Sequence, residues 1–385
     1  MTQSAPDMNE TDYTMLGVRA LLIPAALAGL IAYQSLTVAP LVVGALIDHR
    51  GFSTSQAGIF SSLELLSMAA VAILLAPNIN RLHRQRWAFG AALVLALMQF
   101  SSAWNWMPGL FYLERMLAGA SAGILVAILA ATIPLSHNPE RLTALIILFD
   151  SAVAVLLYLV LPYLIEFYAL AGAYGFLAVM TLIAAPVFLL LPANGPPPTP
   201  LSPAMRGDAI RLACYAVLVA TAGMALWSFT ERMGVAIGLD LATIGTIFAA
   251  SIFVGLAGAG LAAAVGQKWG SFWPVLIGGA SLWLCSALVP QASVPLSFII
   301  LFGVSRFAQN FTDPFLVAVV ARLDTQGRLM GVNAGVGLLG AALGPFLAGM
   351  LVEGGAFHRL SYLYIGLIVT GFAFFWPYLW RDRTR

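Results

Sequence analysis

The sequence predicts an all-α integral membrane protein in which twelve transmembrane helices form two pseudo-symmetric six-helix bundles. Three observations predict this fold: an apolar composition, a proline-rich interruption near the middle, and a repeat that relates the flanking halves. Of the 385 residues, 61% are hydrophobic and 9% are charged, whereas soluble domains carry roughly 25% charged residues. So little polar surface does not suffice to coat a water-soluble particle of this size.

The interruption spans residues 194–207 and reads NGPPPTPLSPAMRG. Its prolines remove backbone donors and fix φ, which excludes a helix, and consecutive prolines favour an extended, solvated spacer. We therefore divide the chain into an N-terminal six-helix bundle (1–193), a cytoplasmic proline-rich linker (194–207) and a C-terminal six-helix bundle (208–385). The polar first residues are not typical of a signal peptide, so we expect the first apolar run to remain as a membrane anchor.

A helix needs about 20 apolar residues to cross a bilayer, and backbone groups in lipid must bond within their own segment. The runs are continuously apolar and do not alternate, which does not fit a β-barrel. The twelve expected spans are 17–45, 55–77, 87–104, 108–134, 142–166, 172–192, 208–232, 241–265, 272–290, 294–321, 329–352 and 360–380.

The loop charges predict orientation, because short cytoplasmic loops of membrane proteins are rich in Lys and Arg. One side carries Arg81, Arg84, Arg86, Arg141, Arg206, Lys268, Arg322, Arg328, Arg381, Arg383 and Arg385. The other side has Arg50, Arg359 and, at a helix end, Arg232. We therefore expect both termini and the linker to be cytoplasmic, in a multi-pass protein of a bacterial inner (plasma) membrane.

An internal repeat relates the two halves. Gly51 and Gly238 are 187 positions apart. The same offset relates Gly58 to Gly245, Arg81 to Lys268 and Arg141 to Arg328. Repeats in the same order, each with an even number of spans, enter the membrane with the same polarity. Parallel halves of this kind are a known transporter design, with the site between them near mid-membrane.

Three motifs carry a family resemblance. Arg81 and Arg84 survive from a loop pattern G-x3-D-R-x-G-R, although its glycines and aspartate do not. The pattern R-x3-G-x3-[GA] is matched by Arg115, Gly119 and Gly123, and G-x3-G-P-x3-G by Gly340, Gly344, Pro345 and Gly349. Over its whole length the chain resembles a major facilitator superfamily transporter of unassigned subfamily.

One departure bears on the alternatives. In drug–proton antiporters of this family the glycine–proline run lies on the fifth helix. Here the corresponding stretch, 154–162, lacks the glycines. The multidrug-exporter interpretation is weakened by this difference and stays open as an alternative.

Ionisable groups within the spans are costly and are kept mainly when they have a function or a partner. Glu64 and Asp150 lie roughly 13–14 Å along their helices, and we expect them to be the proton-coupling groups. Arg115 is expected to approach Asp150 within one helical turn, and to line the cavity. The alternative for each is a permanent structural contact: a carboxyl bonded to a neighbouring helix, or a fixed bridge. Glu114 is expected to face a neighbouring helix or the outer mouth.

The second half has one dense polar stripe, because Gln309, Asn310 and Asp313 follow Arg306 at i+3, i+4 and i+7. The resemblance places the first, fourth, seventh and tenth helices around a central cavity, so the stripe is expected to line it. The cavity candidates are Arg115, Arg306, Gln309, Asn310, Tyr33, Gln34 and Trp227. The gating candidates are Arg81, Arg84, Asp313 and Lys268. Glu231 and Arg232 are expected at the outer surface.

The remaining patterns do not support catalysis. The G-x-S-x-G match at 119–123 needs a base, and all four histidines lie in expected loops. The G-x-G-x-x-G match at 335–340 lacks a preceding strand. We expect no enzyme activity, cofactor or metal. The net charge of +2 gives no reason to expect nucleic acid.

The sequence thus predicts a secondary active transporter in the lipid bilayer, expected to be a monomer. It would move a small anionic or polar organic solute by alternating access, coupled to protons. The alternatives are a proton-driven exporter of hydrophobic, drug-like compounds and, in another class, a non-transporting membrane receptor or scaffold.

Overall fold

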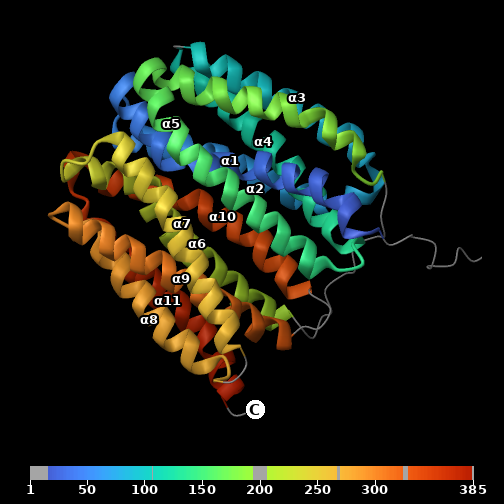
Figure 1. The fold of residues 1–385 in the computed structure, drawn as a ribbon, viewed down its shortest axis with the longest axis vertical. Coiled ribbons are helices and arrows are strands. Elements are labelled where there is room, and N and C mark those ends of the chain that lie inside the picture. Colours follow the sequence, from blue (N-terminus) through green and yellow to red (C-terminus); the bar gives the residue numbers. More distant parts are fainter. Residues whose placement is uncertain (1–15, 106, 194–205, 267–268, 324–327, 384–385) are drawn as a thin grey trace, which may run out of the picture.

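The computed structural model describes residues 16–105, 107–193, 206–266, 269–323 and 328–383. Figure 1 shows two groups of helices, α1 to α5 and α6 to α11, with α10 beside the first group. In chain order the helices are α1 (Val18–Arg50), α2 (Thr54–Leu75), α3 (Arg84–Trp104), α4 (Pro108–Thr132), α5 (Pro139–Ala184), α6 (Arg206–Ala236), α7 (Leu241–Val265), α8 (Phe272–Leu288), α9 (Pro295–Leu323), α10 (Arg328–Leu351) and α11 (His358–Arg383).

Local sequence signals explain where helices stop and start. Gly51 ends α1 in the left-handed conformation at φ 66°, and Ser53 then opens α2 with a capping box to Gln56. Asp240 caps α7 by accepting a hydrogen bond from the Thr243 amide at 2.8 Å. That bond holds the pKa of the Asp240 carboxyl below its usual range.

Helix α5 contains a reversal that the sequence prediction drew as a loop between 166 and 172. Its 46 residues would extend about 69 Å as a straight helix, roughly twice the thickness of a bilayer core. The chain instead turns at Ala169, where φ is 52° and ψ is −143°. A Cβ on Gly172 would overlap the carbonyl oxygen of Leu164, so only glycine permits so sharp a turn.

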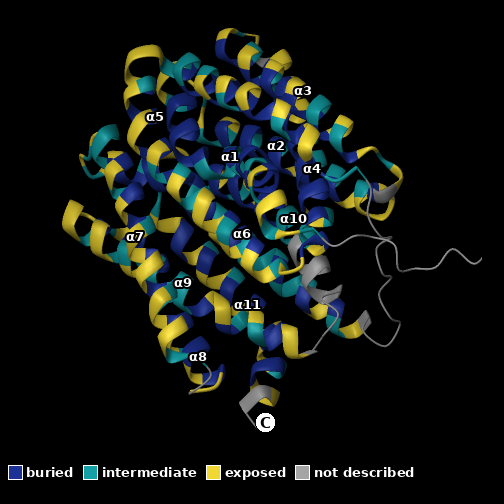
Figure 2. Ribbon diagram, turned by 45° about the vertical axis from the view of Figure 1, so that its right-hand side comes forward, coloured by how far each residue is buried: buried dark blue, intermediate teal, exposed yellow. Residues whose placement is uncertain are grey.

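With α5 counted as two arms, the described helices match the predicted order of spans. Nine helices of the described part are long and apolar enough to cross a membrane, with the long α5 counted once. Large hydrophobic side chains such as Leu74, Phe167 and Ile183 are more than 70% exposed. Outward-facing residues of α3, α5, α7 and α8 are exposed, and buried ones gather where α1, α2 and α4 meet (Figure 2). Such an exposed apolar exterior suits lipid and makes this an integral, multi-pass membrane protein.

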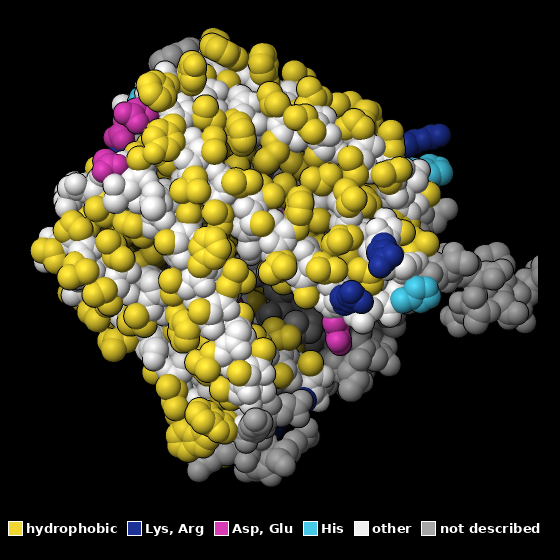
Figure 3. Space-filling view, viewed as in Figure 1, with side chains coloured by type: hydrophobic (Ala, Val, Ile, Leu, Met, Phe, Trp, Pro, Cys, Tyr) yellow, Lys and Arg dark blue, Asp and Glu magenta, His cyan; other side chains and the backbone are white. Residues whose placement is uncertain are grey.

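Charged groups on the visible face divide by sign (Figure 3). Lys, Arg and His gather at the right-hand edge of that view, and most of the visible Asp and Glu gather at the upper left. Hydrophobic side chains cover the area between, and the surface is hollowed near its centre. This arrangement agrees with the loop charges on which the predicted orientation depends.

The two halves meet through glycines at the end of the bundle where α1 ends and α2 begins, which we call the Arg50 end. A Cβ on Gly58 of α2 would overlap the carbonyl oxygen of Pro345 in α10, and one on Gly245 of α7 would overlap that of Tyr158 in α5. Gly58 and Gly245 are a pair from the sequence repeat. The repeat therefore coincides with two equivalent contacts between the halves. Most of the linker, 194–205, and Lys268 lie outside the described residues, and the domain boundaries stay predictions.

Candidate functional site

A cavity of about 470 Å³ lies between the two halves. The first half contributes Leu36 and Thr37 from α1 and Tyr158 from α5. The larger share of the lining comes from the second half, on α6, α8, α9 and α11. Of the predicted cavity residues, Arg306, Gln309 and Trp227 line it.

Arg306 is held in place by two neighbours. Its Nη1 donates to Gln309 Oε1 at 2.8 Å, one turn further along α9. The guanidinium carbon lies 5.4 Å from the ring centroid of Trp227 on α6, within the range of a cation–π contact. Among the described residues no carboxylate lies within ion-pair distance of Arg306. The arrangement leaves a fixed positive charge at the cavity wall.

A proline in α1 explains how the halves are bonded beside the cavity. Pro40 has no N–H, so the carbonyl of Leu36, four residues earlier, loses its helical donor. Trp227 Nε1 donates to this Leu36 oxygen at 2.8 Å, which links α6 to α1. Tyr158 on α5 donates to the neighbouring Thr37 oxygen at 3.0 Å. Local sequence therefore creates the acceptor that fixes the indole ring.

Four of the predicted cavity residues do not line the cavity: Arg115, described below, and Asn310, Gln34 and Tyr33. Asn310 donates to the Arg306 carbonyl at 3.0 Å and faces Gly255 of α7. Gln34 is 1% exposed and donates to Thr181 Oγ1 at 3.1 Å, inside the first half. Tyr33 packs against apolar clusters of the first half. The prediction failed for these residues because adjacent positions on a helix point about 100° apart.

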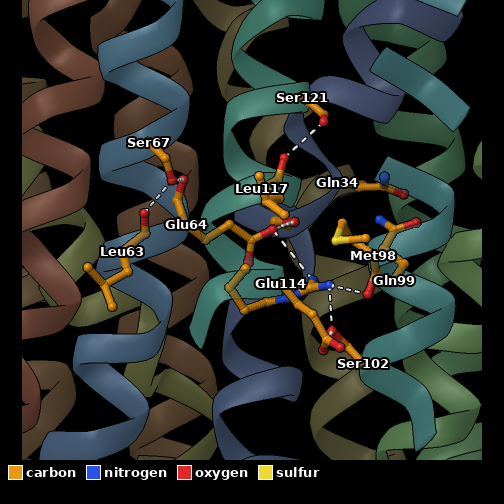
Figure 4. A network of polar contacts seen from close by, with 12 residues as sticks. Gln34, Leu63, Glu64, Ser67, Met98, Gln99, Ser102, Glu114, Leu117 and Ser121 are labelled. Carbon is orange, nitrogen blue, oxygen red and sulfur yellow. Dashed lines mark hydrogen bonds and ion pairs between the residues drawn. The ribbon is translucent and has the colours of Figure 1, made fainter. Parts of the chain in front are cut away.

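The charged centre of the first half has a different pairing from the one predicted. Arg115 on α4 is fully buried and lies 3.8 Å from Glu64 Oε1 on α2. Ser35 of α1 donates to the same Glu64 oxygen at 2.6 Å. Arg115 Nη2 also donates to the Met98 carbonyl and to Ser102 Oγ, both on α3 (Figure 4). The predicted approach of Arg115 to Asp150 is wrong.

Glu114 belongs to the same centre. Its two carboxylate oxygens accept hydrogen bonds from Ser101, Ser102 and Asn105 at 2.5, 2.8 and 3.0 Å. Ser102 therefore bridges Glu114 and Arg115 through one hydroxyl group. Glu114 faces the neighbouring helix α3 and is 3% exposed, which is one of the two places predicted for it. The cavity of about 470 Å³ is not lined by Glu64, Glu114 or Arg115.

The small residues of the helix-four motif bring this centre together. A Cβ on Gly119 would overlap the carbonyl oxygen of Glu64, and one on Gly123 would overlap that of Met68. Helices α4 and α2 therefore touch backbone to backbone at Glu64 and at Met68, one turn further along α2. This approach places the Glu64 carboxylate within reach of Arg115, one turn before Gly119 on α4.

Asp150 does not take part in that ion pair and packs against α1 at Gly29. Its Oδ2 is 3.3 Å from where a Cβ on Gly29 would stand, and its Oδ1 is buried without a hydrogen-bond partner among the described residues. The residue is of intermediate exposure. An unpartnered carboxylate oxygen is costly, so Asp150 remains a candidate for protonation.

The Arg50 end carries an ion cluster that sequence reasoning missed. Arg232 of α6 makes two bonds of 2.7 Å to Asp48 of α1, and two of 2.6 Å to Glu231. Glu231 is fully buried beneath Gly44 of α1. The prediction of the outer surface is wrong for Glu231, whereas Arg232 is half-buried and meets the exposed Asp48. The span was predicted to end at 232, whereas α6 continues to Ala236, which places Arg232 one turn deeper.

The gating candidates occupy different environments. Arg81 is exposed, in the short helix Ala76–Arg81. Arg84 is 1% exposed and donates to the Ala131 carbonyl at 3.1 Å, within its own half. Asp313 is exposed and close enough to Arg306 and Tyr215 for an electrostatic interaction.

Comparison with known proteins gives a sequence match and several fold matches. Residues 212–385 match the family model described as Major Facilitator Superfamily. No curated protein matches the chain in sequence. The xylose transporter XylE from E. coli, in a partially occluded inward-open conformation, is similar with a TM-score of 0.72 at 13% identity. That alignment covers 94% of this chain and 99% of the other.

Two further solved structures are similar at this level. A D-xylose–proton symporter aligns with a TM-score of 0.70 and 16% identity, covering 95% of this chain and 98% of the other. A bacterial homologue of the human lysosomal transporter Spinster aligns with a TM-score of 0.67 and 13% identity, covering 98% of each chain. Identities this low establish the fold alone. The second half of the chain thus matches the Major Facilitator Superfamily in sequence, and almost the whole chain shares the fold of these transporter structures.

Proposed function

We propose that the protein moves a small organic anion across the membrane by alternating access, coupled to protons. The supporting observation is Arg306, a guanidinium at the wall of the cavity between the halves with no carboxylate in ion-pair distance among the described residues. The halves are the bundles 1–193 and 208–385, joined by the linker 194–207. The cavity is the place where a solute would meet both.

An anion fits this position for a physical reason. Removing a lone charge from water is costly, and a partner of opposite charge lowers that cost. The planar guanidinium presents donors that match two oxygens of a carboxylate at once. Gln309 orients the group through its Oε1, and its amide N–H groups remain available as further donors. A bound anion would complete the pairing that the protein leaves open.

Glu64 is the first proton-coupling candidate. It contacts Ser35 of α1 and Arg115 of α4, so its charge state affects how three helices hold together. It also lines a small separate cavity of about 20 Å³, enough for roughly one water molecule. Asp150, with its unpartnered oxygen, is the second candidate. Asp313, Arg81 and Arg84 stay proposals for gating.

We place the protein in a bacterial inner membrane as a monomer with cytoplasmic termini. The support is the excess of Arg in the loops at the end where α3 begins. In that orientation the Arg50 end faces outward, and the inter-half contacts of Gly58, Gly245 and Arg232 close it.

Proteoliposomes containing the full chain test the proposal. Labelled succinate, lactate and naphthalene-2-sulfonate are presented with and without an imposed pH gradient, and protein-free liposomes measure the leak. We expect at least one anion to exchange, and its accumulation to require the gradient and to disappear with a protonophore.

The variant Glu64→Gln separates proton coupling from solute movement. It keeps the shape of the side chain and removes its titration, so exchange should persist while gradient-driven accumulation is lost. If the wild-type protein accumulates the solute equally with and without the pH gradient, the claim of proton coupling is wrong. Absence of exchange for all three anions removes the claim of organic-anion transport.

A further inference from the structure

The lining of the central cavity is dominated by aromatic rings. Trp227 and Phe302 lie nearly parallel, with an interplanar angle of 8° and ring centroids 6.4 Å apart. Tyr158 meets Trp227 edge-on at 6.2 Å. Trp283 and Tyr364 add further rings from α8 and α11. Flat apolar faces of this kind bind flat or alicyclic ligand bodies through area burial and stacking.

Most polar side chains in the lining are already committed to carbonyl groups of the protein. Thr230 and Ser305 donate within their own helices, at 2.8 and 2.7 Å. Tyr158 and Trp227 donate to carbonyls of α1 at 3.0 and 2.8 Å. Arg306 differs. Among the described residues its guanidinium donates to one other side chain, Gln309, and this bond uses one of its five N–H groups.

This distribution of donors bears on substrate class. A sugar buries several hydroxyl groups, and each one left without a hydrogen bond costs free energy. The cavity concentrates its uncommitted donors at one point, Arg306 and Gln309, and surrounds that point with rings. A ligand that matches it has one anionic group and an apolar body. The volume of about 470 Å³ falls in the ordinary range for small-molecule sites.

We infer that the transported solute is an amphipathic organic monoanion: a carboxylate held by Arg306 and Gln309, with an aromatic or alicyclic body against Trp227 and Phe302. This inference rests on the proposed function, because it names the solute class of that cavity. It separates the protein's ligand from the sugars named for two of its structural neighbours.

Binding to the purified full chain tests the class without requiring transport. Thermal-shift titrations use 2-naphthoate, its neutral isostere naphthalene-2-carboxamide, acetate and D-xylose. We expect 2-naphthoate to raise the melting temperature with saturation and the other three to do so at least tenfold more weakly. Equal stabilisation by the carboxamide or by xylose, or no stabilisation by 2-naphthoate, overturns the inference.

Two variants assign the contacts. Arg306→Gln should weaken 2-naphthoate binding by about tenfold to a hundredfold, as expected for a lost charge-assisted hydrogen bond. Phe302→Leu should weaken it by roughly twofold to tenfold, as expected for a lost aromatic contact. The control Arg359→Gln makes the same charge change at an exposed position and should bind as the wild type does. Unchanged affinity in Arg306→Gln overturns the assignment.

The binding and flux assays fail in different ways. Exchange of succinate or lactate without 2-naphthoate binding contradicts the amphipathic class and leaves organic-anion transport standing. Saturable 2-naphthoate binding that Arg306→Gln weakens, with no exchange of any anion, supports the ligand class and contradicts the transport function.

Discussion

At the scale of single residues, the burial of Arg115 has a consequence for stability. It is fully buried among two carboxylates, Glu64 and Glu114, of which the first has no other cationic contact within 4 Å among the described residues. Removing one member of a buried ion pair costs about 3–5 kcal/mol, because the other charge stays buried without compensation. We therefore expect Arg115→Ala to lower the melting temperature of the purified protein strongly.

A second substitution distinguishes this cause from simple loss of packing. Glu64→Gln in the Arg115→Ala background removes the uncompensated charge, so it should recover part of the lost stability. Arg359→Ala, at an exposed site, should change stability within about 0.5 kcal/mol. If the double variant melts no higher than Arg115→Ala, the two side chains do not interact as described.

Single residues were also where sequence prediction was least reliable. The sequence identified the rare charged positions, because lipid makes them conspicuous, but not their partners. Arg115 meets Glu64 rather than Asp150 because close packing of α4 on α2 decides the distance. Gln309 lines the cavity and Asn310 does not, although the two are adjacent. A face can be assigned only once the rotation of the helix is known.

At the scale of elements, α4 and α2 depend on glycine for their contact. A Cβ on Gly119 would overlap the Glu64 carbonyl, whereas one on Gly175 of α5 meets nothing within 4 Å. Gly119→Ala should therefore lower the melting temperature, because the helices must separate. Gly175→Ala is the matched control: alanine is favoured over glycine in a helix by up to about 1 kcal/mol, so stability should be unchanged or higher. Equal melting of the two variants would contradict a tight α4–α2 contact.

The elements were the best-predicted part of the fold. Spans follow from apolar runs, because lipid requires each crossing segment to satisfy its own backbone. Ends were less certain, since a hydropathy window closes at the first charges while the helix continues. The extra turn of α6 beyond Arg232 is why the ion cluster with Asp48 was missed. The apolar runs predicted the break near Ala169 but not its geometry, which depends on Gly172 fitting against Leu164.

At the scale of the whole molecule, the bond from Arg232 to Asp48 joins the halves at the Arg50 end. We expect Asp48→Asn to favour opening there, because the bidentate ion pair is lost. A loss of about 1 kcal/mol, the upper value for an exposed ion pair, corresponds to a roughly fivefold change in population.

Cysteine labelling measures that shift. Ser305→Cys places one thiol in the cavity lining, in a background in which Cys214 and Cys285 are serine. An impermeant maleimide applied to intact cells should label it several-fold faster when Asp48 is asparagine. Glu353→Gln, an exposed carboxylate change, should leave the rate unaltered. Identical rates in both variants would show that this bond does not hold the end shut.

The paired glycines Gly58 and Gly245 have a consequence for how the two bundles move relative to each other. At each glycine a helix of one bundle packs directly against the backbone of a helix in the other, with no side chain between them. Two such contacts, at equivalent positions of the sequence repeat, would let the bundles rotate against each other without separating interdigitated side chains. The pivot of the motion is then a pair of non-covalent contacts. The distance between the helices at each contact is set by the hydrogen atom that glycine has in place of a side chain. Even one methyl group at Gly58 or Gly245 would push the two bundles apart and reduce the range of their relative rotation.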